Sequence, residues 1–568
     1  MYDLFVENIF LEFTVIICFA AVVSLVFRFF KQPEILAYIL TGILIGPFGL
    51  FHLTNQSTFQ TLSQVGITLL LFMVGLEIKL SEHFQIGKSL LLSALGQIAL
   101  TFAAAYGLTF VFGFSLIEAL YLSVALTFSS TIIIVKILSD KRDLHSLYAK
   151  ISLGILLAQD LVAIFILMFL SAFNHVANPA AALGQFGFVF LKAVLVFGAV
   201  IYLSKSVFPK LVELIAKSPE TLFLVSLAWV FGFAAFISSP LIGFSIEIGG
   251  FLAGLALANS IANYQIIAKA KILRDFFIVI FFVLLGVQMT FGNIERVIVP
   301  AIVFSLFVLL LKPLLVMGLL GILGYRKRTS FLTGISLSQI SEFSLILVFL
   351  GNRLGHVSKD LVTLVTLICI ITFVVSTYLI TNGNKIYLSV GKWFTFLERK
   401  NLKKDEVIEE LENFDSLNDH VVIIGGDQMG QSILDALEDG HDEVVVIDFD
   451  PAIVKKLKDK KIHRLFGDIA DIDIQERAKL DSAKLVISTI PDVEDNLLLL
   501  RLLHKENKKA KVVVMALDGI DAKSLYKAGA DYVVLPHLAG GRQIAKIIIE
   551  NHVSHIEDLR KKDREYLL

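Results

Sequence analysis

Long apolar runs with few charges fill the first two thirds of the chain, and short β-branched runs alternating with amphipathic segments fill the last third. A run of about 20 apolar residues is long enough to cross the hydrocarbon core of a bilayer as a helix. The first pattern therefore predicts an all-α polytopic membrane domain, and the second predicts a Rossmann-like α/β domain. We count thirteen apolar runs, at residues 5–27, 34–52, 59–78, 88–112, 116–138, 147–172, 184–207, 220–237, 241–259, 272–291, 296–324, 330–351 and 359–382.

The distribution of lysine and arginine over the loops predicts the orientation of these runs. Loops after odd-numbered runs carry most of the basic residues, and loops after even-numbered runs carry few. Because cytoplasmic loops are enriched in basic residues, we expect the N-terminus outside and the C-terminal domain in the cytoplasm. The first segment, MYDLFVENIF, lacks the basic region and cleavage site of a signal peptide, so we expect a retained first helix. The expected location is the plasma (inner) membrane of a prokaryote.

One acidic residue, Asp160, lies in the middle of the apolar run at 147–172, directly after Gln159. An ionised side chain at the centre of a bilayer costs about 2.5–3.5 kcal/mol or more, so such residues usually line a water-filled path or pair with a partner. We therefore interpret Asp160 as an ion- and proton-binding residue. The alternative is a carboxylate that is hydrogen-bonded between helices for packing, a role that asparagine or serine could fill at lower cost.

Two other runs contain polar clusters at mid-membrane depth. Hydroxyl and amide side chains there can satisfy backbone groups that are freed where a helix unwinds, as in transporters with broken helices. Ordinary interhelical hydrogen bonding is the alternative. The clusters lie seven runs apart, so one enters the membrane in the opposite sense to the other, as an inverted repeat requires. They comprise Thr127, Ser129, Ser130 and Thr131 in the fifth run and Ser338, Gln339, Ser341 and Glu342 in the twelfth.

A second charge within an apolar run is Lys312, which lies near the middle of the eleventh run and is followed by Pro313. A lysine at that depth needs a counter-charge, and Asp160 is the best candidate in a packed repeat. A cation that binds Asp160 would break this pair and release Lys312 to lose a proton, which exchanges one proton for one cation. The alternative is that Lys312 extends its ammonium group to the membrane interface.

The last third contains a glycine-rich turn between a predicted strand and a predicted helix. Six short runs, beginning with VVIIG at 421–425 and ending with YVVLP at 532–536, predict a six-stranded parallel sheet. Asp448 ends the second strand, 23 positions after the first glycine of the turn, which is close to the dinucleotide-binding fingerprint. The turn consists of Gly425, Gly426, Asp427, Gln428, Met429 and Gly430.

Composition and charge narrow the function classes. A mean hydropathy of +0.78 is too apolar for a soluble protein. The net charge of −1 gives no indication of nucleic-acid binding. The only two cysteines, Cys18 and Cys369, both lie in apolar runs and cannot form an extracellular disulfide framework.

The membrane region resembles the monovalent cation:proton antiporter superfamily, and the Kef-type potassium:proton branch in particular. The resemblance implies a thirteen-helix homodimer with a scaffold and a mobile core. Gln159 and Asp160 match the Gln-Asp pair of that branch, and one acid in place of two favours potassium and electroneutral exchange. Lys312 falls where relatives carry a lysine embedded in the membrane. Glu342 lies in the SQxxEF signature, where a structural role for it stays open. The role of Glu247 also stays open. The resemblance rests on seven runs, at residues 33–47, 69–78, 128–138, 158–164, 249–258, 281–289 and 338–347.

The C-terminal domain resembles the RCK N-terminal (TrkA-N-like) domain, which implies nucleotide binding by the glycine turn, Asp448 and Asp468. Two departures affect the ligand. Asp427 places a carboxylate where the fingerprint has its second glycine, and Met515 follows the fifth strand where relatives often have arginine. Both changes disfavour a diphosphate such as NAD(H) and favour AMP, or no ligand. Retention of the domain for dimerisation alone is the alternative. The basic segment at 263–277 replaces the acidic loop of glutathione-gated Kef systems, so glutathione control is not supported.

Together these observations predict a transporter, not an enzyme, that exchanges potassium for protons under the control of a cytoplasmic RCK domain. The same fold could instead exchange sodium. A ligand-gated potassium channel would need a selectivity filter of the TVGYG kind, which the sequence lacks, and a membrane-anchored nucleotide sensor without transport is the remaining alternative. We expect a membrane domain at 1–383, a charged linker at 384–416, the RCK N-terminal domain at 417–555 and a charged tail at 556–568.

Overall fold

The computed structural model describes residues 9–390 and 417–551, except for residues 52, 78–87, 142, 145, 173–178, 210–211, 213–217, 241, 261, 291, 293, 326, 438–442, 449–450, 458–461, 468 and 470–471. Asp468, most of the expected linker and the whole of the expected tail therefore lie outside the described residues. The chain divides into two compact units, one of residues 1–141 and 150–398, which holds nearly all of the apolar helices, and one of residues 142–149 and 399–568, which holds the sheet domain.

A helix, or a pair of helices, lies on each of the thirteen apolar runs. Among the described residues, eight helical segments are long and apolar enough to cross a membrane, and three shorter apolar helices accompany them. The exact number of crossings stays a prediction. In chain order the elements are α2 (Ile9–Phe29), α3 (Glu34–Ile45), α4 (Gln56–Glu77), α6 (Lys88–Val111), α7 (Leu116–Thr127), α8 (Thr131–Lys141), α9 (Leu147–Ala172), α10 (Pro179–Ser206), α12 (Pro219–Ile237), α13 (Ile246–Leu257), α14 (Asn263–Val287), α15 (Ile294–Leu306), the π-helix η1 (Phe307–Leu311), α16 (Lys312–Ile322), α17 (Lys327–Ser336), α18 (Glu342–Arg353), α19 (Lys359–Thr381) and α20 (Gly383–Val390).

Three apolar runs are interrupted, and each interruption has a local cause. The fifth run is broken between α7 and α8 at residues 128–130, and the twelfth between α17 and α18 at residues 337–341. Ser341 starts α18 by accepting a hydrogen bond from the amide of Phe343. In the eleventh run, Pro313 lacks a backbone N–H, and the preceding turn widens into the π-helix. The two predicted broken helices are thus confirmed.

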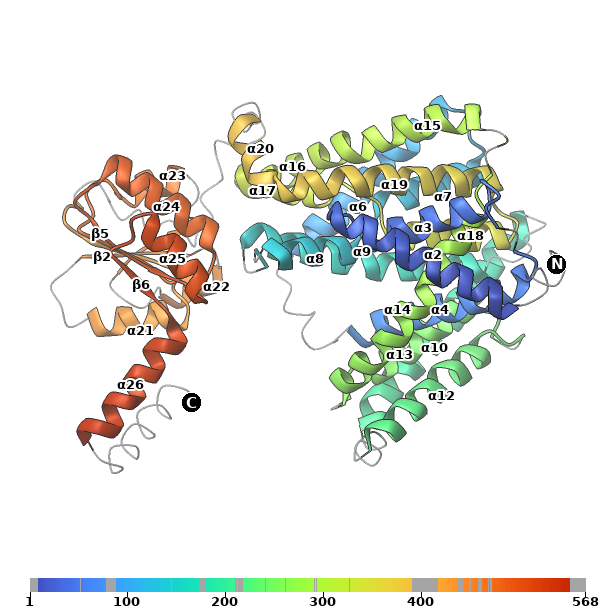
Figure 1. Cartoon of the computed structure of the whole chain (residues 1–568), viewed down its shortest axis with the longest axis horizontal. Helices are drawn as coiled ribbons and strands as arrows, with labels where there is room; N and C mark the ends of the chain where they lie inside the picture. The colour runs from blue at the N-terminus through green and yellow to red at the C-terminus, as the bar shows by residue number, and fades with distance from the viewer. Residues whose placement is uncertain are drawn as a thin grey trace. The chain divides into compact units, whose positions relative to one another are not determined.

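Close packing separates the helices into two bundles. In the scaffold bundle, α4 packs against α13 and α14, and α14 packs against α3, with α2, α10 and α12 completing the group. In the core bundle, α7 packs against α6 and α18, α16 packs against α6 and α17, and α19 packs against α8, α15 and α18. Helices α15 and α19 lie along one edge of this unit and α12 along the opposite edge (Figure 1).

Glycines allow backbones within the scaffold bundle to touch. A Cβ atom at Gly254 on α13 would lie 2.0 Å from the carbonyl oxygen of Phe72 on α4, and one at Gly42 on α3 would lie 2.0 Å from the carbonyl oxygen of Val283 on α14. No side chain larger than hydrogen fits at such separations. The scaffold bundle is therefore held by direct contact between helix backbones.

The second unit is a doubly wound sheet domain with six parallel strands in the order β3-β2-β1-β4-β5-β6. Alternate residues of the strands feed two apolar clusters, one on each face of the sheet. The strands begin and end within two residues of the runs predicted from the sequence. They are β1 (Val421–Ile424), β2 (Val444–Asp448), β3 (His463–Phe466), β4 (Leu485–Ser488), β5 (Lys511–Met515) and β6 (Tyr532–Val534). The helices are α21 (Gln428–Leu437), α22 (Pro451–Lys456), α23 (Ile472–Arg477), α24 (Val493–Glu506), α25 (Gly519–Lys527) and α26 (Pro536–Asn551), and α26 extends away from the sheet (Figure 1).

Candidate functional site

The two broken helices of the core bundle meet at their unwound segments. Ser129 Oγ, in the first break, donates a hydrogen bond to the carbonyl oxygen of Leu337 in the second at 2.9 Å. Gln339 Nε2, in the second break, donates to the carbonyl oxygen of Ser130 in the first at 3.3 Å. All of these groups are buried. The polar clusters predicted in separate runs are therefore one structure in space.

Asp160 lies beside this junction, on α9. The residue is 9% exposed, and its Oδ2 atom accepts a hydrogen bond from Thr131 Oγ1 at 2.9 Å. Thr131 is the first residue of α8, and the positive end of a helix dipole favours a carboxylate there. Glu342 and Glu77 lie close enough to act electrostatically on Asp160. The described contact of the Asp160 carboxylate is the hydrogen bond from Thr131.

Gln159 connects the junction to α6. Its Oε1 atom accepts a hydrogen bond from the amide of Ser129 at 2.8 Å, and its Nε2 atom donates to Gln97 Oε1 at 2.5 Å. Gln97 Nε2 in turn donates to the carbonyl oxygen of Thr127 at 3.3 Å. The sequence reasoning missed Gln97, although a glutamine within an apolar run was a visible signal. Both glutamines satisfy backbone groups that the break in the fifth run leaves free.

Lys312 does not pair with Asp160, so the ion pair predicted from the sequence is wrong. The Lys312 ammonium is fully buried and donates to three backbone carbonyl oxygens, those of Leu126 at 3.2 Å, Phe128 at 3.1 Å and Gln339 at 3.1 Å. An ammonium group has three N–H donors, and these three acceptors use all of them. The carbonyls come from both broken helices, where helix ends concentrate negative partial charge. Backbone dipoles thus take the place of the expected carboxylate.

The remaining predicted site residues have different surroundings. The hydroxyl groups of Thr127 and Ser338 donate to carbonyls of their own helices, so neither points a free hydroxyl at Asp160. Ser130 Oγ accepts from the amide of Ile133 at the start of α8. Glu342 is the first residue of α18 and is 3% exposed, and its Oε2 atom has no hydrogen-bond partner among the described residues. Glu342 is therefore a second buried carboxyl group with free acceptor capacity.

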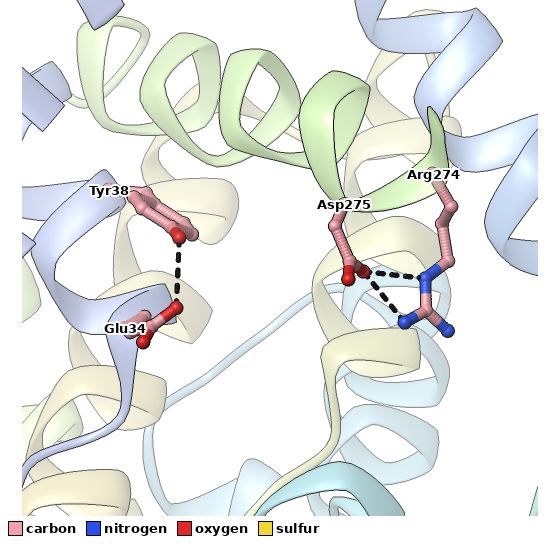
Figure 2. Close-up of polar contacts among 4 residues, drawn as sticks. All are labelled: Glu34, Tyr38, Arg274 and Asp275. Atoms are coloured by element: carbon pink, nitrogen blue, oxygen red, sulfur yellow. Dashed lines mark hydrogen bonds and ion pairs between the residues drawn. The ribbon is translucent and has the colours of Figure 1, made fainter. Parts of the chain in front are cut away.

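The scaffold bundle presents a charged group on the side of α14. Figure 2 shows Arg274 bound to its neighbour Asp275, with Nη2 and Oδ1 2.7 Å apart, and Tyr38 donating to Glu34 on α3 at 3.2 Å. Although it is held by Asp275, the Arg274 charge also acts on Glu77 and Glu342. One scaffold cation is therefore within electrostatic range of the acids around Asp160.

In the sheet domain, the glycine turn lies between β1 and α21 as predicted. Gly425 has φ of +94°, and a Cβ atom at Gly430 would lie 1.9 Å from the carbonyl oxygen of Gly425, so both positions require glycine. Asp448 Oδ2 accepts from the amide of Gly426 at 2.7 Å. A small hollow that opens to solvent adjoins this turn. It is lined by Ile424, Gly425, Ile447, Asp448, Gly467, Ile469 and Ile490.

Asp427 changes what the turn can bind. Its exposed carboxylate accepts a hydrogen bond from the amide of Gln428 at 2.8 Å, at the start of α21. In a dinucleotide site, this helix end attracts the diphosphate. Here a carboxylate already uses one of its amides and would repel a further anion. Gln428 is exposed and Met429 is half-buried at the same turn, and Met515 is buried at the end of β5.

These features define a multi-pass membrane protein with a carboxylate beside two facing broken helices and a nucleotide-type α/β domain after them. The chain belongs to the sodium/hydrogen exchanger family, whose transmembrane domain matches residues 15–381, and the TrkA-N domain matches residues 421–536.

Three curated relatives are similar over most of the chain. The putative cation/proton antiporter YbaL of Escherichia coli is 27% identical over 537 residues, which is 92% of this chain and 93% of that protein. The putative K(+) efflux antiporter KefB of Alkalimonas amylolytica is 24% identical over 519 residues, covering 91% and 78%. The iron transporter MagA of Paramagnetospirillum magneticum is 28% identical over 349 residues, covering 61% and 79%.

Proposed function

We propose that this chain exchanges a monovalent cation, potassium, for a proton across a membrane, and that Asp160 carries both. The observation behind this proposal is the buried Asp160 carboxylate, which accepts one hydrogen bond from Thr131 beside two facing broken helices. A carboxylate can hold a proton or a cation but not both at one oxygen pair. Cation and proton therefore compete for Asp160, which is the requirement for obligatory exchange.

The proposed exchange is electroneutral. In one state Asp160 is protonated, and in the other its negative charge is balanced by the bound cation, so the site has the same net charge on each crossing. Lys312 donates to three carbonyl oxygens at the helix ends and makes no contact with Asp160. The proposed exchange at Asp160 therefore does not require Lys312 to release a proton. Glu342 supplies further oxygen atoms to the same region.

Potassium is the cation we propose, for two reasons. The site has Gln159 next to Asp160 in place of a second acid at that position, and several of the chain's relatives are named K(+) efflux antiporters. The family description names sodium and another relative is named an iron transporter, so the experiment must compare cations.

We further propose that the sheet domain regulates transport by binding a nucleotide with a single phosphate, such as AMP. The Asp448 carboxylate lines the hollow, whereas the Asp427 carboxylate stands where a diphosphate would bind. We expect the protein to act as a homodimer in the inner membrane of a prokaryote, with the sheet domain in the cytoplasm.

The decisive experiment uses the full chain in proteoliposomes that contain a pH-sensitive dye. Addition of potassium should change the internal pH in the wild-type protein, and Asp160→Asn should abolish this change. Glu220→Gln is the matched control, because Glu220 is an exposed carboxylate in the first turn of α12. Exchange by Asp160→Asn at the wild-type rate refutes the role of Asp160. A larger response to sodium or lithium than to potassium refutes the choice of cation, and AMP and NADH added in parallel test the ligand.

A further inference from the structure

Two groups of hydrogen bonds join the scaffold and core bundles at one end of the described membrane helices. In the first group, Arg353 of the core bundle contacts two scaffold residues, Glu247 and Gln64. In the second, Thr290, which follows α14 of the scaffold bundle, contacts Asp360 and Thr363 of α19. Both groups lie next to loops that the charge distribution predicts to be external.

Arg353 is bound on both sides of its guanidinium group. Its Nη1 atom lies 3.2 Å from Glu247 Oε1. With the Gln64 amide oriented so that its oxygen faces the guanidinium group, that oxygen accepts from Nη1 and Nη2 at 2.7 and 2.8 Å. Glu247 is 7% exposed and Arg353 is 43% exposed, so the acid is buried in the seam and the arginine closes over it. We call these three residues the latch.

Both charges of the latch lie at helix ends whose dipoles stabilise them. Arg353 is the last residue of α18, and Glu247 lies in the first turn of α13. A cation at a helix C-terminus and an anion at an N-terminus are each stabilised by the dipole of their own helix. The latch can therefore open without leaving either charge unfavourably placed. This arrangement suits a pair that forms and breaks in every cycle.

At the other end of the membrane helices, Arg274 of the scaffold bundle acts electrostatically on Glu342 of the core bundle and is bound to its own neighbour Asp275. A contact that joins the two bundles at the latch end favours the state in which the core bundle opens toward the opposite side, as alternating access requires.

We propose that the latch is a positioning device for the exchange reaction: it holds the core bundle in the state that exposes Asp160 to the side opposite the latch, and it must open once per cycle. The proposal rests on the proposed function and assigns Glu247, Gln64 and Arg353 to transport although none of them touches the ion. Hydrogen bonds to a charged group and a partly exposed ion pair together favour the latched state by about tenfold to a hundredfold.

The test measures transport from each side separately. In proteoliposomes of known orientation, Glu247→Gln should lower the apparent KM for potassium on the latch side and raise it on the other side, changing their ratio at least about tenfold, because apparent affinity follows the fraction of the competent state. The charge swap Glu247→Arg with Arg353→Glu should restore the ratio. Glu118→Gln is the matched control: Glu118 accepts from Ser358 at 2.9 Å at the same end, but inside the core bundle.

Each outcome decides one question. If the wild-type protein exchanges potassium for protons and Glu247→Gln leaves the KM ratio unchanged, the latch is refuted and the proposed function stands. If the wild-type protein shows no exchange, the proposed function fails, and hydrogen exchange decides the latch. Peptides covering α13 and the end of α18 should exchange faster in Arg353→Gln than in the wild type and in Glu118→Gln. Equal exchange in all three proteins refutes the latch.

Discussion

Replacement of Lys312 by methionine separates the two possible roles of this residue. If Lys312 paired with Asp160, each residue would depend on the other. In the structure, the Lys312 ammonium binds the carbonyls of Leu126, Phe128 and Gln339, and no hydrogen bond or ion pair joins it to Asp160. Lys312→Met therefore removes the donor of three buried acceptors and leaves Asp160 with its bond from Thr131.

The magnitude follows from those three bonds. An acceptor left without a partner in a buried site costs about 1–3 kcal/mol. Three such carbonyls set an upper range of about 3–9 kcal/mol, and methionine lets the broken helices relax, so we expect a loss near the lower end, about 3–5 kcal/mol. Lys312→Arg keeps the charge and several donors but not the compact shape of the ammonium group, and it should lose less stability than Lys312→Met.

The assay is a double-mutant cycle on thermal or denaturant unfolding of the purified full chain. Wild type, Lys312→Met, Asp160→Asn and the double variant give the coupling free energy between the two positions. For residues without a shared contact we expect a coupling below about 0.5 kcal/mol. A coupling above about 1.5 kcal/mol, with the double variant more stable than Lys312→Met alone, would show that the two charges pair, and our account of Lys312 would be wrong.

Three further predictions follow from contacts described above. Gly254→Ala should destabilise the protein by about 1–3 kcal/mol or more, because the added Cβ atom overlaps the backbone of α4. Gly198→Ala is the control and should leave the stability unchanged, because a Cβ atom there meets nothing within 4 Å. Equal melting temperatures for the two variants would contradict this account of the packing. Asp427→Gly should tighten NADH binding about tenfold or more in calorimetry of the full chain, because a carboxylate close to a phosphate repels it by about 1–4 kcal/mol, and unchanged affinity would count against the repulsion. The Lys511 ammonium, 2.7 Å from Asp531, holds the pKa of that carboxyl below its usual range. The pair therefore stabilises the domain at pH values above the ordinary carboxyl pKa, and this stabilisation is lost as the pH falls through the lowered pKa. Lys511→Met should therefore shrink the change in amide protection of β5 between about pH 6 and about pH 3, as measured by hydrogen exchange.

The central acid and the two broken helices could be predicted from the sequence, because a buried charge and an unwound membrane helix each cost free energy and each require characteristic residue types. A carboxylate amid apolar residues, such as Asp160, is expensive unless it has a function. Hydroxyl clusters such as Ser129–Ser130 are frequent where a membrane helix unwinds. The doubly wound sheet could also be predicted, because short β-branched runs alternate with amphipathic segments and a glycine turn follows the first run.

The partner of Lys312 could not be predicted, because backbone carbonyls carry no signature in the sequence. Every residue has one, and only the fold decides that those of Leu126, Phe128 and Gln339 converge. A search among side chains therefore selected Asp160, the nearest available acid by type. The latch was also beyond prediction, because Glu247 and Arg353 are 106 residues apart and lie on different bundles.

The contacts of Lys312 tie the two broken helices to one another. One ammonium joins the carbonyl of Leu126 on α7 to the carbonyl of Gln339 in the segment before α18. Neither break can therefore be displaced without stretching a hydrogen bond to the other, and we expect the two helices to move as one body during transport.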